Sequence, residues 1–255
     1  MSLFRKSNGE MPFLDHLEEL RWRILWSLLA IIIFTIIGFF VVNEFGVLQL
    51  LIAPIEPFLD GSKLKYLNPT APFFITLKLA LSVGLLFAAP VVVYHIWAFL
   101  SPALHVSEKR AIVPALYFGL LLFMGGVAMA YFVALPMTLQ FTMSFQTESL
   151  EQSIVIEQYM SLVIRMLLAF GLIFEMPVLI LALTFLGLVT PEFLTEKRRH
   201  AYAIIVVVAA LITPGDVITL TAMMMVPLIV LYEISIALSR VIVRKRRIAE
   251  VAVQN

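Results

Sequence analysis

The chain has 255 residues, of which 62% are hydrophobic and 14% are charged, and its formal net charge is +1. Soluble domains are roughly half apolar and one quarter charged, so no soluble core needs this much apolar sequence. The chain contains no Cys, which excludes disulfides, thiolate metal ligands and Cys nucleophiles. Its apolar residues are gathered into blocks joined by short polar stretches, which predicts a single membrane domain over residues 1–255.

The first predicted element lies just before the first long apolar block. Apolar residues recur there at helical spacing, at Phe13, Leu17, Leu20 and Ile24. This pattern predicts an amphipathic helix over residues 12–23 that lies at the membrane surface. Its polar side carries Asp15, Glu18 and Glu19, although lipid headgroups usually attract basic residues. A surface helix that served only to bind lipid would not carry this acidic cluster.

The long apolar blocks predict membrane-spanning helices, because about 20 apolar residues cross about 30 Å of hydrocarbon. Six spans are predicted, at about residues 24–42, 73–99, 111–135, 159–188, 201–212 and 217–238. The turn-forming string Thr213-Pro214-Gly215-Asp216 makes the last two a hairpin. The fifth span would rise only about 18 Å as a helix. A short span is accommodated by thinning of the local bilayer, by polar ends that reach outward, or by packing against a partner. Alternatively, the helix also includes His200 and Thr213.

Prolines punctuate the even-numbered spans, at Pro90, Pro177 and Pro227. Each would bend its helix and leave a backbone carbonyl for a neighbour to satisfy, which indicates a concave and rigid shape. Proline is also common in membrane helices, so a bend need not be functional. The basic tail over residues 240–255 is expected to lose helical structure after its first turn or two.

Lys and Arg residues are distributed unevenly along the chain. Fourteen of the 18 lie at the termini and in the second and fourth loops, whereas the opposite loops hold only Lys63 and Lys65. The positive-inside rule therefore places both termini in the cytoplasm. The predicted fold class is all-α: a polytopic membrane protein with six transmembrane helices, both termini inside, concave, with short last two helices.

Two carboxylates lie on the predicted cytoplasmic face, Glu19 before span one and Glu108 before span three. Glu19 is spaced for an i,i+4 ion pair with Arg23. Glu108 falls in a first helical turn, where the helix dipole stabilises a carboxylate. These structural roles are sufficient explanations. The alternative is that the two carboxylates together bind a partner with two positive charges.

Glu175 lies near the middle of the fourth predicted span, where an ionised carboxylate is costly and a functional role is the default hypothesis. Arg165 precedes it by ten residues, which is about 15 Å of helical rise, so Arg165 is not its partner. Glu233 lies seven residues before Arg240, shallow enough to be hydrated or salt-bridged. We expect a structural role for Glu233.

Enzyme and metal-site signatures are missing from the sequence. It has no His-Glu-x-x-His, no Gly-x-Ser-x-Gly and no Gly-rich phosphate loop. Its four histidines fit no metal motif. No cofactor, metal site, catalytic residue or nucleic-acid partner is therefore expected.

Four strings, in the right order on the predicted spans, resemble the TatC family, the membrane receptor subunit of the twin-arginine protein translocase. They are His16-Leu17-Glu18-Glu19-Leu20-Arg21-Trp22-Arg23, Ser101-Pro102-Ala103-Leu104 through Glu108-Lys109-Arg110, Phe170-Gly171 through Phe174-Glu175-Met176-Pro177, and Thr213-Pro214-Gly215-Asp216. The similarity runs from about Pro12 to Arg247. Each string alone is weak evidence, but the set is highly specific.

This resemblance implies a non-enzymatic receptor in the bacterial cytoplasmic membrane, which binds twin-arginine signal peptides of folded cargo and works with the proton-motive force. The positions that match the family's signal-binding surface are Glu19, Arg21, Phe99 and Glu108. Those that match its other functional positions are Pro54, Phe73, Tyr131, Glu175 and Asp216. The implied partners are TatB-like and TatA-like single-span subunits and further copies within a multi-subunit complex.

The sequence departs from the family pattern at two positions. Gly215 stands where a second Pro is usual, and Leu220 stands where many members have a Gln that docks a single-span partner. The hairpin turn tolerates the first change. The second puts the polar part of the docking site in doubt and leaves Thr213 as the nearest candidate beside Leu220.

Two functions from other classes compete with this interpretation. A secondary transporter or proton channel would use Glu175 as an ion or proton site. Such a protein would be expected to show internal repeats and broken helices, and the sequence shows no convincing repeat. An intramembrane hydrolase would need a nucleophile or a metal set, and the sequence supplies neither.

Overall fold

The structure is a computed structural model that describes residues 13–59, 61–100, 112–144, 153–213 and 218–254. Within these ranges the chain is helical, and strand pairing is limited to the isolated bridge between Lys65 and Val155. The helices are α1 (Phe13–Glu44), α2 (Val47–Ile52), η1 (Glu56–Phe58), α3 (Ala71–Leu100), α5 (Ile112–Met129), η3 (Ala130–Ala134), α6 (Leu135–Ser144), α7 (Ile156–Phe174), α8 (Met176–Phe185), α9 (Pro191–Glu196), α10 (Arg198–Ile212) and α11 (Ile218–Gln254). The prediction of an all-α fold is confirmed.

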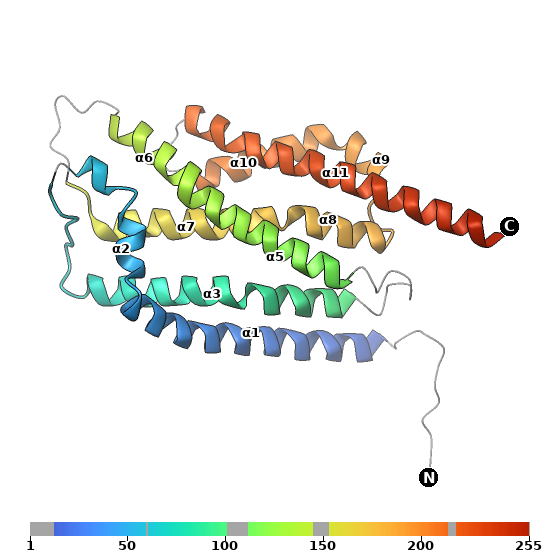
Figure 1. Cartoon of the computed structure of the whole chain (residues 1–255), viewed down its shortest axis with the longest axis horizontal. Helices are drawn as coiled ribbons and strands as arrows, with labels where there is room; N and C mark the ends of the chain where they lie inside the picture. Colours follow the sequence, from blue (N-terminus) through green and yellow to red (C-terminus); the bar gives the residue numbers. More distant parts are fainter. Residues whose placement is uncertain (1–12, 60, 101–111, 145–152, 214–217, 255) are drawn as a thin grey trace, which may run out of the picture.

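The long helices lie roughly parallel or antiparallel to one another (Figure 1). Among the described residues, five helical segments are long and apolar enough to cross a membrane: Asp15–Glu44, Ala71–Phe99, Pro114–Ser144, Ile156–Phe185 and Thr221–Arg244. The predicted fifth span is α10, whose 15 residues rise only about 22 Å. The chain is therefore a multi-pass membrane protein in which α10 is short, as predicted. The last helix is not short, because α11 continues for 37 residues. The start of α1 and the end of α11 lie at the same end of the bundle (Figure 1).

The first helix differs from its prediction. Residues 13–44 form one continuous α-helix, so the prediction of a separate surface helix before the first span is wrong. No Pro or Gly interrupts the chain between Phe13 and Gly38, and nothing there favours a bend. The acidic cluster therefore lies on the first turns of a membrane-spanning helix.

Two further helical segments extend beyond their predicted ends. The third span does not end at Leu135 but continues through α6 to Ser144. Hydroxyl groups of Thr138 and Thr142 donate to backbone carbonyls one turn earlier, which accommodates polar residues within the helix. The basic tail also stays helical to Gln254, so the predicted loss of helical structure beyond its first turn or two is wrong. Its Arg, Lys, Ala and Glu residues are good helix formers.

The three prolines have different effects. Pro90 and Pro227 lie inside the uninterrupted helices α3 and α11. The fourth span, by contrast, breaks at Glu175 into α7 and α8, with Pro177 in the first turn of α8. Proline cannot donate a backbone hydrogen bond, so Pro177 leaves the carbonyl one turn earlier without its helical donor. This break places Glu175 at a helix junction.

Close packing of small residues joins α1 to α3. A Cβ atom on Gly84 would lie 2.5 Å from the Cα of Thr35, and one on Gly38 would lie 2.6 Å from the carbonyl oxygen of Ala80. Side chains at either position would push the two backbones apart, as at other small-residue membrane contacts. Only 6% of the most apolar window of α1 is buried. The position of α1 therefore depends mainly on this contact with α3.

Substitution of Gly84 by Ala should loosen this contact. The added methyl group meets the backbone of Thr35, which cannot turn aside as a side chain would, so we expect a destabilisation of about 1 to 3 kcal/mol. Gly125→Ala is the matched control, because its Cβ would have no atom within 4 Å among the contacts that the structure describes. Thermal unfolding of the purified protein in lipid nanodiscs measures both. Equal stability of the two variants would contradict the proposed packing.

Candidate functional site

The first candidate site lies where α1 begins and α3 ends, at the same end of the bundle (Figure 1). The imidazole ring of His16 stacks on the phenyl ring of Phe99, with ring centroids 4.3 Å apart and planes 12° from parallel. Glu19 lies one helical turn after His16, and Oε2 of Glu19 is 3.8 Å from Nδ1 of His16. Glu19 and Phe99 therefore both lie beside His16, and these are two residues that the family resemblance assigns to one surface.

The carboxylate of Glu19 already has a partner within α1. Nε of Arg23 donates to Oε1 of Glu19 at 2.8 Å, and Nη2 of Arg23 donates to the same oxygen. The predicted i,i+4 ion pair is thus present. Oε2 of Glu19 is buried and has no hydrogen-bond donor among the residues that the structure describes. One oxygen is engaged and the other remains an acceptor.

The remaining residues of the expected signal-binding surface are placed less completely. Arg21 is exposed on α1, two residues from Glu19. Glu108 lies outside the described residues. Among the described residues, Glu19 and Phe99 both lie beside His16, and Arg21 is exposed on α1. The proposed role of Glu108 is not tested.

A groove of about 250 Å³ runs beside this cluster, between α1 and α3. It is mostly apolar, and its polar lining comes from Arg23, Ser27 and His95. Nδ1 of His95 is buried without a partner among the described residues. Sequence reasoning missed His16 and His95 as neighbours of the site. The spacing held a signal, because His95 precedes Phe99 by one helical turn and so shares its face of α3.

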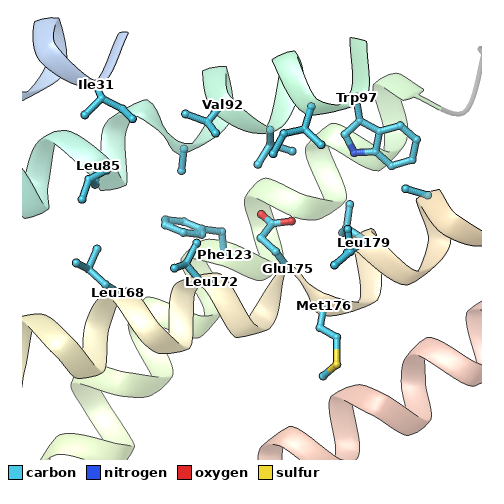
Figure 2. Close-up of a pocket in the computed structure, with 15 residues that line it drawn as sticks. Ile31, Leu85, Val92, Trp97, Phe123, Leu168, Leu172, Glu175, Met176 and Leu179 are labelled. Atoms are coloured by element: carbon cyan, nitrogen blue, oxygen red, sulfur yellow. The ribbon is translucent and has the colours of Figure 1, made fainter. Parts of the chain in front are cut away.

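The second candidate site surrounds Glu175. Its carboxylate points into a pocket of about 440 Å³, lined almost entirely by apolar side chains of α3, α5, α7 and α8 (Figure 2). Phe123, Leu172 and Leu179 lie around the carboxylate, whereas the side chain of Met176 points to the other side of the helix (Figure 2). Oε1 of Glu175 is buried and lacks a hydrogen-bond partner in the described part of the chain.

A glycine on the facing helix makes room for this carboxylate. A Cβ atom on Gly119 of α5 would lie 2.9 Å from Oε2 of Glu175. Glu175 thus faces a concavity between helices rather than the outer surface of the bundle. Arg165 forms no salt bridge with Glu175, which agrees with the sequence-based exclusion.

Two tyrosine hydroxyls hold α2 in place near the opposite end of the bundle, and one of them belongs to the expected site residue Tyr131. The hydroxyl of Tyr131 donates to the carbonyl of Leu50, and the hydroxyl of Tyr159 donates to that of Leu51, each at 2.7 Å. Tyr131 lies in η3, a π-helical turn, and such turns often occur at functional sites. Pro54 is half-buried after α2, and the side chain of Phe73 is exposed at the start of α3.

The last hairpin is described in part. Thr213 ends α10, and its buried hydroxyl donates to the carbonyl of Ala209 at 2.8 Å. Asp216 lies outside the described residues, and of Leu220 only its place in α11 is described. Glu233 pairs with Arg198 at 2.6 Å and accepts from the hydroxyl of Tyr202 at 2.7 Å, which confirms its predicted structural role.

A family model described as Sec-independent protein translocase protein (TatC) matches residues 15–227. The chain belongs to the TatC family. The resemblance drawn from the four strings is therefore confirmed.

TatC proteins from distant bacteria are similar over nearly the whole chain. The protein of Aquifex aeolicus (strain VF5) is 39% identical over 239 residues, which cover 93% of this chain and 98% of that relative. The protein of Escherichia coli (strain K12) is 37% identical over 237 residues, covering 92% and 91%. A crystal structure titled as the twin-arginine translocase receptor TatC has 38% sequence identity and a TM-score of 0.78, and the match covers 89% of this chain and 98% of that one. The TatC fold thus places the Glu19 cluster and the Glu175 pocket on a translocase subunit.

Glu175→Gln should reduce transport without reducing the thermal stability of the protein. The amide keeps the shape of the side chain but removes a charge that sits in an apolar pocket without a partner among the described residues. We expect an unchanged or raised midpoint of thermal unfolding, because a buried carboxylate is costly, together with a severalfold loss of transport of a folded reporter carrying a twin-arginine signal. Gly125→Ala serves as the control. Full transport by Glu175→Gln would reject a functional role for the charge.

Proposed function

We propose that this TatC-family chain is the receptor that binds twin-arginine signal peptides, and that the paired arginines bind at the start of α1. The observation that carries the proposal is the convergence of the Glu19 carboxylate and the Phe99 ring, joined by the His16 stack. A carboxylate offers a bidentate acceptor for a guanidinium group, and an aromatic face attracts a cation. The two features together suit an arginine side chain.

Two adjacent arginines need more than one acceptor. On an extended segment, neighbouring side chains point in different directions, so one carboxylate cannot bind both. Glu108, which belongs to the signal-binding surface by its match to the family pattern, is proposed as the second acceptor. Arg21 completes this surface, exposed on the same helix as Glu19.

The proposed setting is a bacterial cytoplasmic membrane with both termini in the cytoplasm. Fourteen of the 18 Lys and Arg residues lie in segments that this orientation places inside. The signal-binding surface then faces the compartment in which cargo proteins fold. We propose further that the subunit is not an enzyme and that the proton-motive force supplies the energy for transport.

The proposed partners are TatB-like and TatA-like single-span subunits, with further copies of the chain in a multi-subunit complex. The last hairpin, with Thr213 and Leu220, is the proposed docking region. The hydroxyl of Thr213 is already bonded within α10, so this site would rely on apolar contact more than on a polar one. Pro54, Phe73, Tyr131 and Asp216 are proposed to act at the opposite face, and Glu175 within the membrane.

A transporter or proton channel built around Glu175 is less favoured. The pocket around Glu175 has almost no polar lining, whereas an ion or proton path needs polar groups along its length. Membership of the TatC family also accounts for nearly the whole chain.

Glu19→Ala and Glu108→Ala should each weaken peptide binding while the protein still inserts and folds. Each arginine contact lies near the headgroup region and is partly hydrated, so its loss should reduce the free energy of peptide binding by about 1 to 3 kcal/mol. Binding of a labelled twin-arginine peptide should therefore fall by roughly 5- to 150-fold in each variant. Crosslinking of the peptide, together with thermal unfolding, measures both effects.

Glu18→Ala is the matched control, because it removes the same charge from an exposed position on the same helix. It should change binding little. Normal peptide binding by the Glu19 and Glu108 variants, with lowered stability, would show that the two carboxylates have only structural roles.

A further inference from the structure

Arg23 already donates hydrogen bonds to one oxygen of the Glu19 carboxylate. The proposed function assigns this same carboxylate to an arginine of the signal peptide. Both Nε and Nη2 of Arg23 donate to Oε1 of Glu19, and neither donates to Oε2. Oε2 is buried and without a donor among the described residues. The internal pair therefore uses only half of the acceptor capacity of Glu19.

The guanidinium group of a peptide arginine could bind both oxygens of the Glu19 carboxylate, whereas Arg23 binds only one. The favoured arginine–carboxylate geometry is a fork in which two parallel N–H groups reach the two oxygens. The peptide arginine needs both Oε1 and Oε2 for that fork, so Arg23 must give up Oε1. Arg23 and the peptide arginine thus compete for the same atom.

The groove beside the site offers Arg23 a second position. Arg23, Ser27 and His95 together supply the polar lining of this groove of about 250 Å³. Nδ1 of His95 is buried without a partner in the described part of the chain. A neutral imidazole accepts one hydrogen bond, and a guanidinium has five N–H groups to donate. A displaced Arg23 would therefore find an acceptor without leaving the interface of α1 and α3.

We propose that Arg23 is a built-in competitor for Glu19, bound to it in the free receptor and displaced toward His95 when a twin-arginine signal binds. This inference rests on the proposed function and deepens it. Arg23 then sets the affinity threshold of the receptor, because any ligand that uses Oε1 of Glu19 must offset the cost of displacing Arg23.

Arginine and lysine in the signal differ in how well they replace the internal contact. A peptide guanidinium replaces it with a bidentate one, whereas a lysine ammonium is a point charge that cannot reproduce the fork. Displacement of Arg23 costs the same free energy for both ligands. The preference for arginine therefore comes from the fork, and Arg23 lowers the affinity for both ligands by the same factor.

The test compares peptides with paired arginines and paired lysines on the full chain in lipid nanodiscs. Internal ion pairs of this kind are worth up to about 1 kcal/mol, so Arg23→Gln should bind the arginine peptide about two- to fivefold more tightly. The affinity for the lysine peptide should rise by the same factor, because both ligands displace Arg23, so the ratio of the two affinities should stay unchanged. Arg199→Gln is the control, because this substitution removes the same charge from an exposed position on α10. It should leave both affinities unchanged.

A double-mutant cycle separates competition from a general change in charge. In a Glu19→Gln background, Arg23→Gln should no longer tighten binding, because the contested carboxylate is absent. A gain that persists in this background would overturn the proposal and assign the effect to long-range charge. His95→Leu removes the acceptor that a displaced Arg23 would use. It should weaken binding of the arginine peptide when Arg23 is present, and should have no effect in the Arg23→Gln variant.

The outcomes also distinguish this inference from the function on which it rests. If the native chain does not prefer the arginine peptide, and Glu19→Gln binds as the native chain does, the proposed function fails. If the native chain shows that preference and Glu19→Gln weakens it, but Arg23→Gln binds no more tightly than the native chain, only the competitor role is overturned. Thermal unfolding of each variant confirms that a folded receptor is being compared.

Discussion

The close approach of α1 to α3 is the constraint on which the rest of the site depends. Gly84 and Gly38 let the two backbones meet, and little else in the described structure holds α1, whose apolar surface is mostly exposed. The two helices run antiparallel, so this contact fixes which residues meet at their far ends. His16 reaches Phe99, and Glu19 comes to the edge of the same cluster. A contact between the two helices, well away from their ends at the cluster, thus determines the geometry of the Glu19 site.

Two carboxylates stand out, and their surroundings differ. Glu19 lies at the end of the bundle with a guanidinium partner, a neighbouring imidazole and a half-free acceptor, which suits exchange of one cation for another. Glu175 lies at a helix break in an apolar pocket, beside a glycine that leaves space for its oxygens. A site that exchanges ligands needs access and a weak internal partner. An ionisable side chain without a partner inside a membrane-spanning bundle is instead a functional-site hypothesis by default.

Much of this architecture could be predicted from the sequence, for reasons that particular elements make clear. The apolar runs that form α3 and the helices α7 and α8 end at polar residues, so their limits were predicted to within a few residues. The start of α1 was misjudged, because its amphipathic pattern changes to an apolar one without any residue that breaks the helix. Glu19 and Phe99 could be assigned to one surface only through family motifs. Their contact through His16, and the groove beside His95, depend on the crossing of two helices, which periodicity along one chain does not contain.

The central claim is that a signal-peptide arginine binds between Glu19 and Phe99. The most direct measurement places a photo-crosslinking phenylalanine analogue at position 99 and maps which peptide residue it captures. The account predicts capture of residues adjoining the paired arginines, strong loss of that product with Glu19→Gln, and no such product from a peptide with paired lysines. Equal capture from the arginine and lysine peptides, or capture that does not depend on Glu19, would contradict it.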